Sequence, residues 1–165
     1  MTISGLSGRP RRLLIKLLSA GLRAVDPVQA VRRTVRRAGP WLHVGDTRYD
    51  LRRYRSVVLV GAGKASAPMA RELESVLGDR LGGGLVVVKY GHGIRTRRVR
   101  VVEAGHPVPD RAGLEGATRL LELVTRLTPD DLLLVALSGG ASSLDRKSTR
   151  LNSSHSSVSR MPSSA

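Results

Sequence analysis

Four short apolar segments in the second half of the chain alternate with segments of helical periodicity. The apolar segments span residues 56–60, 85–89, 98–103 and 132–137. Apolar residues recur at helical spacing over residues 64–78 and 110–127, and this spacing predicts two helices. Apolar strands without alternation, separated by helices, are typical of a parallel sheet covered on both faces. We therefore predict an α/β fold, a Rossmann-like three-layer α/β/α sandwich with a mostly parallel sheet.

Within this region, two features refine the expected boundaries. The run Gly82 to Gly84 predicts a glycine turn before the second strand, and Asp110 is the expected N-cap of the second helix. Its expected apolar face comprises Leu114, Ala117, Leu120, Leu121, Val124 and Leu127. If the native part of the chain stops near Leu144, the sheet is incomplete.

The first part of the chain predicts two amphipathic helices. Leucines at helical spacing between basic residues indicate a helix over residues 11–25, and Asp26–Pro27 begins a second helix that runs to about Arg37. We expect both helices to pack on the sheet, with a membrane surface as the alternative for a basic amphipathic helix. Residues 41–54, with the turn signal Gly45–Asp46, are compatible with a small hairpin.

Composition divides the chain into three parts. Residues 1–10 are expected to be a flexible N-terminus, and residues 11–144 one truncated α/β domain. Residues 145–165 are rich in Ser and Arg, have no apolar periodicity, and resemble a read-through translation of a sequencing-library adapter. Such a segment cannot bury enough surface to fold, so we expect a disordered, non-native tail.

The formal charge of +15 comes largely from clusters of arginine. A nucleic-acid surface is one interpretation of such clusters, and solvated helix faces are the other. Single-strand binders need aromatic platforms for stacking, whereas this chain has no Phe, one Trp and three Tyr, so we expect no nucleic-acid partner. With no cysteine, no signal-peptide pattern and no apolar run long enough to span a bilayer, we expect a cytoplasmic protein without a membrane partner.

The junction after the first apolar segment carries the clearest candidate chemistry. It reads Gly61-x-Gly63-Lys64-x-Ser66, and a strand that turns into a helix here presents backbone N–H groups to an anion. Ser66 replaces the third glycine of the dinucleotide fingerprint, Lys89–Tyr90 stands where the ribose-binding acid is expected, and the loop does not match a Walker A motif. We predict an anion-binding loop with Lys64 as the neutralising cation, the alternative being a solvated lysine on the first helical turn.

A second glycine loop follows the last apolar segment. Its glycines allow a ligand to approach the backbone, and its hydroxyls can donate hydrogen bonds, although an ordinary small-residue turn would have the same composition. The candidate residues are Ser138, Gly139, Gly140 and Ser142. His106, in the loop Gly105 to Pro109, is a further candidate. Lone histidines do not indicate a metal site, so we name no metal ligand.

Four motifs together resemble the N-terminal domain of the glycerate 2-kinase family, whose second half is the MOFRL domain and whose members are often labelled hydroxypyruvate reductase. They are VVLVGAGKASAPMA, KYGHG, VVEAGHPVPDRAG and LLLVALSGGASSL. In this resemblance Lys64 is the lysine of the GxGKA motif, and Gly105 to Asp110 form the GHPxPD motif. The resemblance covers about Leu13 to Leu144, and the MOFRL domain is missing.

The resemblance implies transfer of a phosphoryl group from ATP to D-glycerate, giving 2-phosphoglycerate, with Mg²⁺ on the nucleotide phosphates. Lys64 would be the catalytic residue. The residues expected to bind phosphate or substrate are Gly61, Gly63, Ser66, His106, Ser138, Gly139, Gly140 and Ser142. We expect the chain to be inactive without the missing domain, and a homodimer is compatible with the resemblance.

Two other functions stay open from the sequence. The incomplete fingerprint and the inherited label of the family suggest an NAD(P)-dependent hydroxypyruvate reductase. The arginine clusters suggest a non-enzymatic nucleic-acid-binding module.

Overall fold

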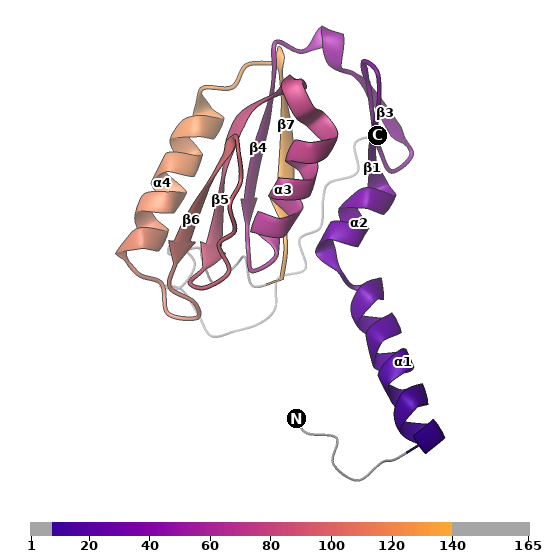
Figure 1. Ribbon diagram of the computed structural model, residues 1–165. Coiled ribbons are helices and arrows are strands. Elements are labelled where there is room, and N and C mark those ends of the chain that lie inside the picture. Colours follow the sequence, from indigo (N-terminus) through magenta and orange to yellow (C-terminus); the bar gives the residue numbers. More distant parts are fainter. Residues whose placement is uncertain (1–7, 140–165) are drawn as a thin grey trace, which may run out of the picture.

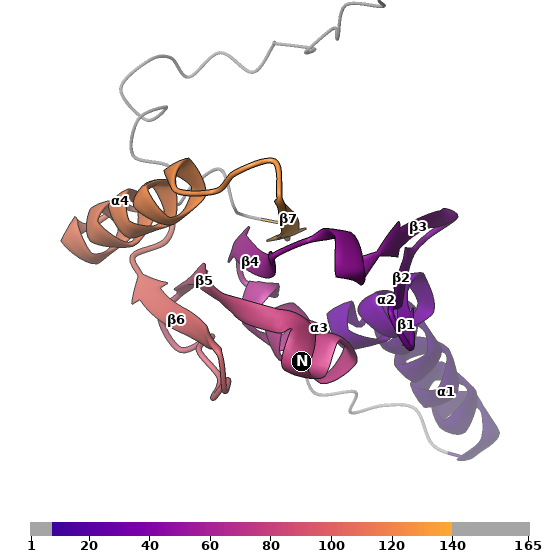
Figure 2. The ribbon, with the colours of Figure 1, turned by 90° about the horizontal axis from the view of Figure 1, so that it is seen from above.

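The computed structural model describes residues 8–139, and these form two sheets and four α-helices (Figure 1). The central sheet has the strands β4 (Ser56–Ala62), β5 (Leu81–Lys89), β6 (Val99–Ala104) and β7 (Asp131–Leu137) in the order β6-β5-β4-β7, and all three pairings are parallel. Helix α3 (Ser66–Leu77) connects β4 to β5, and α4 (Arg111–Thr125) connects β6 to β7. The two helices cover opposite faces (Figure 2), so the predicted three-layer α/β arrangement is confirmed.

A small antiparallel sheet precedes the central one. Helices α1 (Gly8–Ala24) and α2 (Pro27–Thr34) lead into β1 (Val35–Ala38), β2 (Trp41–Val44) and β3 (Thr47–Asp50), which pair in the order β1-β2-β3. Two short 3₁₀ turns, η1 (Leu51–Arg53) and η2 (Gly78–Arg80), precede β4 and β5. The predicted hairpin at Gly45–Asp46 is confirmed as the turn between β2 and β3.

Helix α2 is shorter than predicted. Asp26 caps it as expected, accepting hydrogen bonds from the N–H groups of Val28 and Gln29, but it ends at Thr34 instead of Arg37. Residues 35–38 form β1 because they pair with β2 across the turn at Gly39, which has a positive φ of 57°. Gly39 therefore lies in a hairpin turn between β1 and β2 and does not follow the end of a helix.

Helix α1 departs most clearly from the prediction that both N-terminal helices pack on the sheet. It has no buried residue, and its apolar side chains are exposed, for example Leu17 at 61% and Leu22 at 71%. In Figure 1 the helix extends away from the central sheet, and its main contacts are with α2. No helix within residues 8–139 is both long and apolar enough to cross a bilayer.

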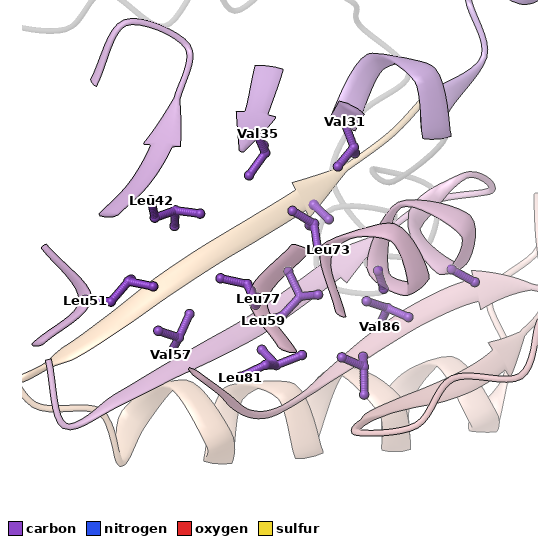
Figure 3. Close-up of a cluster of buried hydrophobic side chains, with 14 of the residues drawn as sticks. Val31, Val35, Leu42, Leu51, Val57, Leu59, Leu73, Leu77, Leu81 and Val86 are labelled. Carbon is purple, nitrogen blue, oxygen red and sulfur yellow. The ribbon is translucent and has the colours of Figure 1, made fainter. Parts of the chain in front are cut away.

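The main core lies between the central sheet and the elements on the α3 side (Figure 3). It joins all the layers on that side, because it draws side chains from α2, the small sheet, α3 and the inner face of the central sheet. Its labelled members are Val31, Val35, Leu42, Leu51, Val57, Leu59, Leu73, Leu77, Leu81 and Val86. A smaller cluster under α4 contains Leu85, Val87 and Ala104.

The apolar face of α4 is narrower than predicted. The residues of α4 that are buried are Gly113 and Gly116, and Leu120 packs on the smaller cluster. Leu114 and Leu121, which were expected in the core, are 44% and 63% exposed. Glycine decides the packing face because a Cβ on Gly116 would lie 3.1 Å from side-chain atoms of both Val87 and Val102.

A buried carboxylate holds the loop that enters β6. Glu74 of α3 is 8% exposed and accepts hydrogen bonds from the N–H groups of Arg97 (2.9 Å), Arg98 (2.7 Å) and Val99 (2.7 Å). Backbone N–H groups at a buried loop need such partners. Glu74 therefore positions the start of β6 against α3.

The predicted glycine turn at Gly82–Gly84 is wrong, because all three glycines lie within β5. They allow β5 to approach β4 closely: a Cβ on Gly84 would overlap the carbonyl oxygen of Leu59 and lie 2.9 Å from its carbonyl carbon. A contact with backbone atoms cannot be relieved by a side-chain rotation. Glycine is therefore required here by the spacing between the strands.

We expect Gly84→Ala to lower the free energy of unfolding by about 3 kcal/mol, the effect of overpacking in a core that cannot adjust. Gly21→Ala is the matched control, since no atom lies within 4 Å of its added Cβ and alanine favours a helix interior by roughly 0.5–1 kcal/mol. Urea unfolding followed by circular dichroism measures both variants. Equal stability of the two variants would contradict the close approach of β4 and β5.

Candidate functional site

The four parallel strands end at the same edge of the central sheet, and the predicted loops meet there. Helices α3 and α4 lie on opposite faces (Figure 2), and the chain order reverses between β4 and β7. Ligands of open α/β sheets bind in the crevice at such a switch point, beyond the carboxyl ends of the strands. The candidate site therefore lies between the loop after β4 and the loop after β7.

Hydrogen bonds bring these two loops together. The N–H of Ala65 donates to Oγ of Ser138 (2.9 Å), and the N–H of Ser138 donates to the carbonyl oxygen of Ala62 (3.1 Å). On the other side, the N–H of Gly63 donates to the carbonyl oxygen of Val87 in β5 (3.0 Å). The predicted lysine loop and serine loop are thus adjacent, although they are more than 70 residues apart in the sequence.

The glycines of the first loop have a packing role. A Cβ on Gly61 would overlap the carbonyl oxygen of Ala136, and a Cβ on Gly63 would lie 2.6 Å from the carbonyl oxygen of Ser138. Gly63 also has a φ of 115°, a conformation that strains any residue with a side chain. Glycine at both positions allows the backbone of β4 and its loop to approach β7.

Ser66 lies in the core instead of facing the crevice. Its side chain is fully buried, and Oγ donates to the carbonyl oxygen of Ala136 at 2.9 Å. A substrate could reach this hydroxyl only if α3 moved away from β7. The structure therefore gives Ser66 a positioning role, which joins the first turn of α3 to β7.

Lys64 is the exposed residue at the tip of the first loop. It makes no ion pair with any residue in the range 8–139. The next residue, Ala65, is the N-cap of α3 and provides no side-chain cap, so the partial positive charge of the helix N-terminus is also directed to this point. Lysine and helix N-terminus together favour an anion beside Ser138.

The loops after β5 and β6 form the other part of this edge. His106 is half-buried in the loop after β6, and no hydrogen bond joins it to Lys64 or Ser138.

Sequence reasoning missed Tyr90, at the end of β5, whose hydroxyl donates to Oδ2 of Asp110 at 2.7 Å. Oδ1 of Asp110 accepts from the N–H of Gly113 (2.9 Å), which confirms Asp110 as the helix cap. The phenol and its partner are 20 residues apart in the sequence, so their contact gives no periodic signal.

The Tyr90–Asp110 contact changes the acidity of both groups. The hydroxyl of Tyr90 and the N–H groups of Gly113 and Gly105 lower the pKa of Asp110, because they stabilise the carboxylate. The pKa of Tyr90 is raised, chiefly because its ionisation would break this hydrogen bond and place two negative charges together. Asp110 is therefore a structural carboxylate that is ionised at neutral pH.

The described residues do not supply a set of metal ligands. Residues 8–139 contain no group of three or more His, Cys, Asp or Glu side chains that could hold a metal ion. Asp110, an acid at the β5–β6 part of the edge, uses both oxygens for Tyr90 and the α4 cap. Lys64 and the N-terminus of α3 suit an anion, whereas residues 8–139 supply no ligand set for Mg²⁺. The predicted site residues Gly140 and Ser142 lie outside the described residues, as does the tail of 145–165.

Comparison with known families gives a match to most of the chain. Residues 13–152 match the family model described as "Domain of unknown function (DUF4147)". Two relatives cover 81% of the chain: the glycerate 2-kinase of Pyrococcus horikoshii at 32% identity and the D-glycerate 2-kinase of Thermotoga maritima at 38% identity.

Two solved structures have the same fold. A Pyrococcus horikoshii protein matches 84% of the chain with a TM-score of 0.73 and 31% identity, and a glycerate kinase from Thermotoga maritima matches 81% with a TM-score of 0.65 and 39% identity. The chain spans 31% and 29% of the lengths of these two proteins. It therefore corresponds to less than a third of each.

We expect Tyr90→Phe to lower the melting temperature at neutral pH and the difference from the unaltered chain to shrink in acid. Because the pKa of Asp110 is lowered in the folded state, its stabilisation is present above the unfolded-state value of about 3.9 and is lost as the pH falls through the folded-state value. Thermal unfolding between about pH 2.5 and pH 7 measures the difference. Tyr54→Phe is the control, because no hydroxyl hydrogen bond of Tyr54 occurs within residues 8–139. A pH-independent difference for Tyr90→Phe would contradict the assignment.

Proposed function

This chain belongs to the DUF4147 family, and from this premise we propose that it is the part of a glycerate kinase that binds the substrate and the phosphates of the nucleotide. In the proposed reaction, the γ-phosphoryl group of ATP is transferred to a hydroxyl of D-glycerate to give 2-phosphoglycerate. The proposal rests on the relatives that carry the glycerate kinase name. The chain alone is expected to be inactive, since it spans less than a third of those relatives.

The structural observation that supports this function is the arrangement of Lys64, the α3 N-terminus and Ser138 at the switch point. Phosphoryl transfer depends mainly on positioning and on neutralising charge at the phosphoryl oxygens and the leaving group. An exposed ammonium, a helix N-terminus and a hydroxyl supply those interactions at one edge of the sheet. Nothing in this arrangement is specific for a nicotinamide ring.

In this proposal Lys64 binds the transferring phosphoryl group or the carboxylate of D-glycerate. Ser138 orients the loop through Ala65 and can donate its own hydroxyl proton to a phosphate oxygen. Gly61, Gly63 and Ser66 act indirectly, because they fix the distance between β4, α3 and β7. His106, Gly139, Gly140 and Ser142 stay predictions as binding residues. Mg²⁺, when bound to the nucleotide, would neutralise phosphate charge.

The residues at the end of β5 also disfavour an NAD-dependent reductase. An NAD site needs an acid at this position to accept hydrogen bonds from the ribose hydroxyls. The chain has Lys89–Tyr90 there, and the Tyr90 hydroxyl is held by Asp110. A cationic residue at this place suits a phosphate better than a ribose.

Binding by the chain as it stands tests the anion site directly. We expect ATP and D-glycerate, added separately, to shift the amide resonances of residues 61–66 and 138–139. Lys64→Ala should weaken ATP binding about tenfold, the loss of one charge-assisted interaction of about 1.4 kcal/mol. Lys16→Ala, which removes an exposed lysine from α1, should leave the affinity unchanged. Equal weakening by both variants would indicate non-specific attraction by a basic chain.

Turnover requires a longer polypeptide, in which residues 1–139 are followed by the part of the Thermotoga maritima D-glycerate 2-kinase that begins at the position matching residue 140. We expect ATP-dependent formation of 2-phosphoglycerate, and Lys64→Ala should lower kcat at least about 100-fold, as the loss of one transition-state donor does. Lys16→Ala should retain full activity. Full activity of Lys64→Ala would remove this residue from the mechanism, and NADH oxidation with hydroxypyruvate would overturn the kinase proposal.

A further inference from the structure

One face of the central sheet is covered over only half its width. The register places Leu85, Val60 and Val135 in one row across β5, β4 and β7. Leu85 and Val60 are each 4% exposed, whereas Val135 is 55% exposed. On the α4 side of the sheet, the side chains of β5 and β4 are therefore buried, whereas those of β7 are not.

The next row repeats this pattern. Val87 of β5, Ala62 of β4 and Leu137 of β7 are aligned, and Val87 is 3% exposed while Leu137 is 62% exposed. Helix α4 packs on β5 and β6, and Figure 2 shows β7 to one side of it. Two large apolar side chains of β7 thus have no cover from the described part of the chain.

Helix α4 adds an apolar flank to this surface. Leu114, Ala117 and Leu121 each follow by one residue a position that packs on the sheet, so their stripe lies about 100° around the helix from the packed face. Leu114 and Leu121 are largely exposed. Because α4 runs antiparallel to the strands and the helix is right-handed, this rotation turns the stripe toward the β7 side of the sheet.

Strand β7 also has a free edge. Within residues 8–139 it pairs only with β4, so the backbone groups on its other side have no strand partner there. An uncovered apolar edge strand is a template for further pairing. The free edge and the exposed apolar side chains thus belong to the same strand, β7.

The handedness of the parallel crossovers determines which elements could extend the sheet beyond β7. The connection from β4 to β5 runs toward β6 and places α3 on one face, and the connection from β6 to β7 runs the opposite way and places α4 on the other face. Both agree with the right-handed rule for parallel crossovers. A further parallel strand on the free edge of β7 would require its helix on the α4 face, directly over Val135 and Leu137.

We propose that β7 and the neighbouring flank of α4 form the docking surface for one helix–strand unit of the longer polypeptide. The helix would cover Val135, Leu137 and Leu121 with an apolar face, and the strand would pair in parallel with β7. About 70% of each solved relative lies outside its match to this chain, which is ample length for such a unit.

A second copy of the chain fits this surface less well. Two copies would bring together chains of formal charge +15 each, which repel one another. A two-fold axis at the edge of β7 would also pair the two strands antiparallel, whereas every pairing in the central sheet is parallel. A unit of the same polypeptide has neither difficulty.

The absence of cysteine from the chain permits a clean test by thiol labelling. Val135→Cys should react rapidly with a small maleimide in this chain. In a cysteine-free version of the longer polypeptide, with residues 1–139 followed by the Thermotoga maritima remainder, the rate should fall at least about tenfold because the site becomes protected. Asp46→Cys, in the exposed β2–β3 turn, is the control and should react equally in both.

Equal labelling of Val135→Cys in the two proteins would overturn the proposal. Protection in this chain alone that increases with protein concentration would also overturn it, since the occupant would then be a second copy. If the longer polypeptide does not fold, the same probe at the matching position of the intact Thermotoga maritima enzyme decides the question: slow labelling supports the proposal and rapid labelling contradicts it. None of these rates depends on ATP or D-glycerate, so failure here is distinct from failure of the proposed function.

Discussion

Close backbone approach around β4 is the constraint on which the rest of the structure depends. Gly61 and Gly63 bring the end of β4 against β7, and Gly84 brings β5 against β4. With these distances set, Ser66 reaches the carbonyl of Ala136 and Ser138 reaches the N–H of Ala65. A single methyl group at any of the three glycines would separate the strands that hold the candidate site.

Acidic side chains are scarce in this basic chain, and several of them organise backbone. Asp26 and Asp110 cap α2 and α4, and Glu74 accepts the N–H groups of three successive residues before and at the start of β6. At the start of β7, Asp131 accepts the N–H of Thr128, and this hydrogen bond and the Arg55 guanidinium lower its pKa. These carboxylates therefore have structural roles in the described part of the chain.

The candidate site shows how far sequence patterns extend. The parallel sheet that the pattern predicted brings the loop at Lys64 and the loop at Ser138 to the same edge, since parallel strands end together, and a hydrogen bond joins them. The pattern did not distinguish residues that can contact a ligand from residues that only position the loops. It predicted Ser66 as a binding residue, although this side chain is buried. It also missed Tyr90, whose partner Asp110 is 20 residues away, because long-range hydrogen bonds have no local signature.

The sequence by itself determined the alternation of strands and helices, the parallel sheet, the cap at Asp110 and the glycine–lysine loop, because these follow from local periodicity and from backbone preferences of single residues. Only the tertiary structure decided that residues 82–84 are strand, that residues 35–38 leave the second helix, and that the apolar sides of α1 and part of α4 stay exposed. Each of these depends on what lies opposite the residue in space. A glycine in a sequence is compatible with either a turn or a close approach of two backbones. An apolar stripe predicts a helix but does not identify the element that covers it.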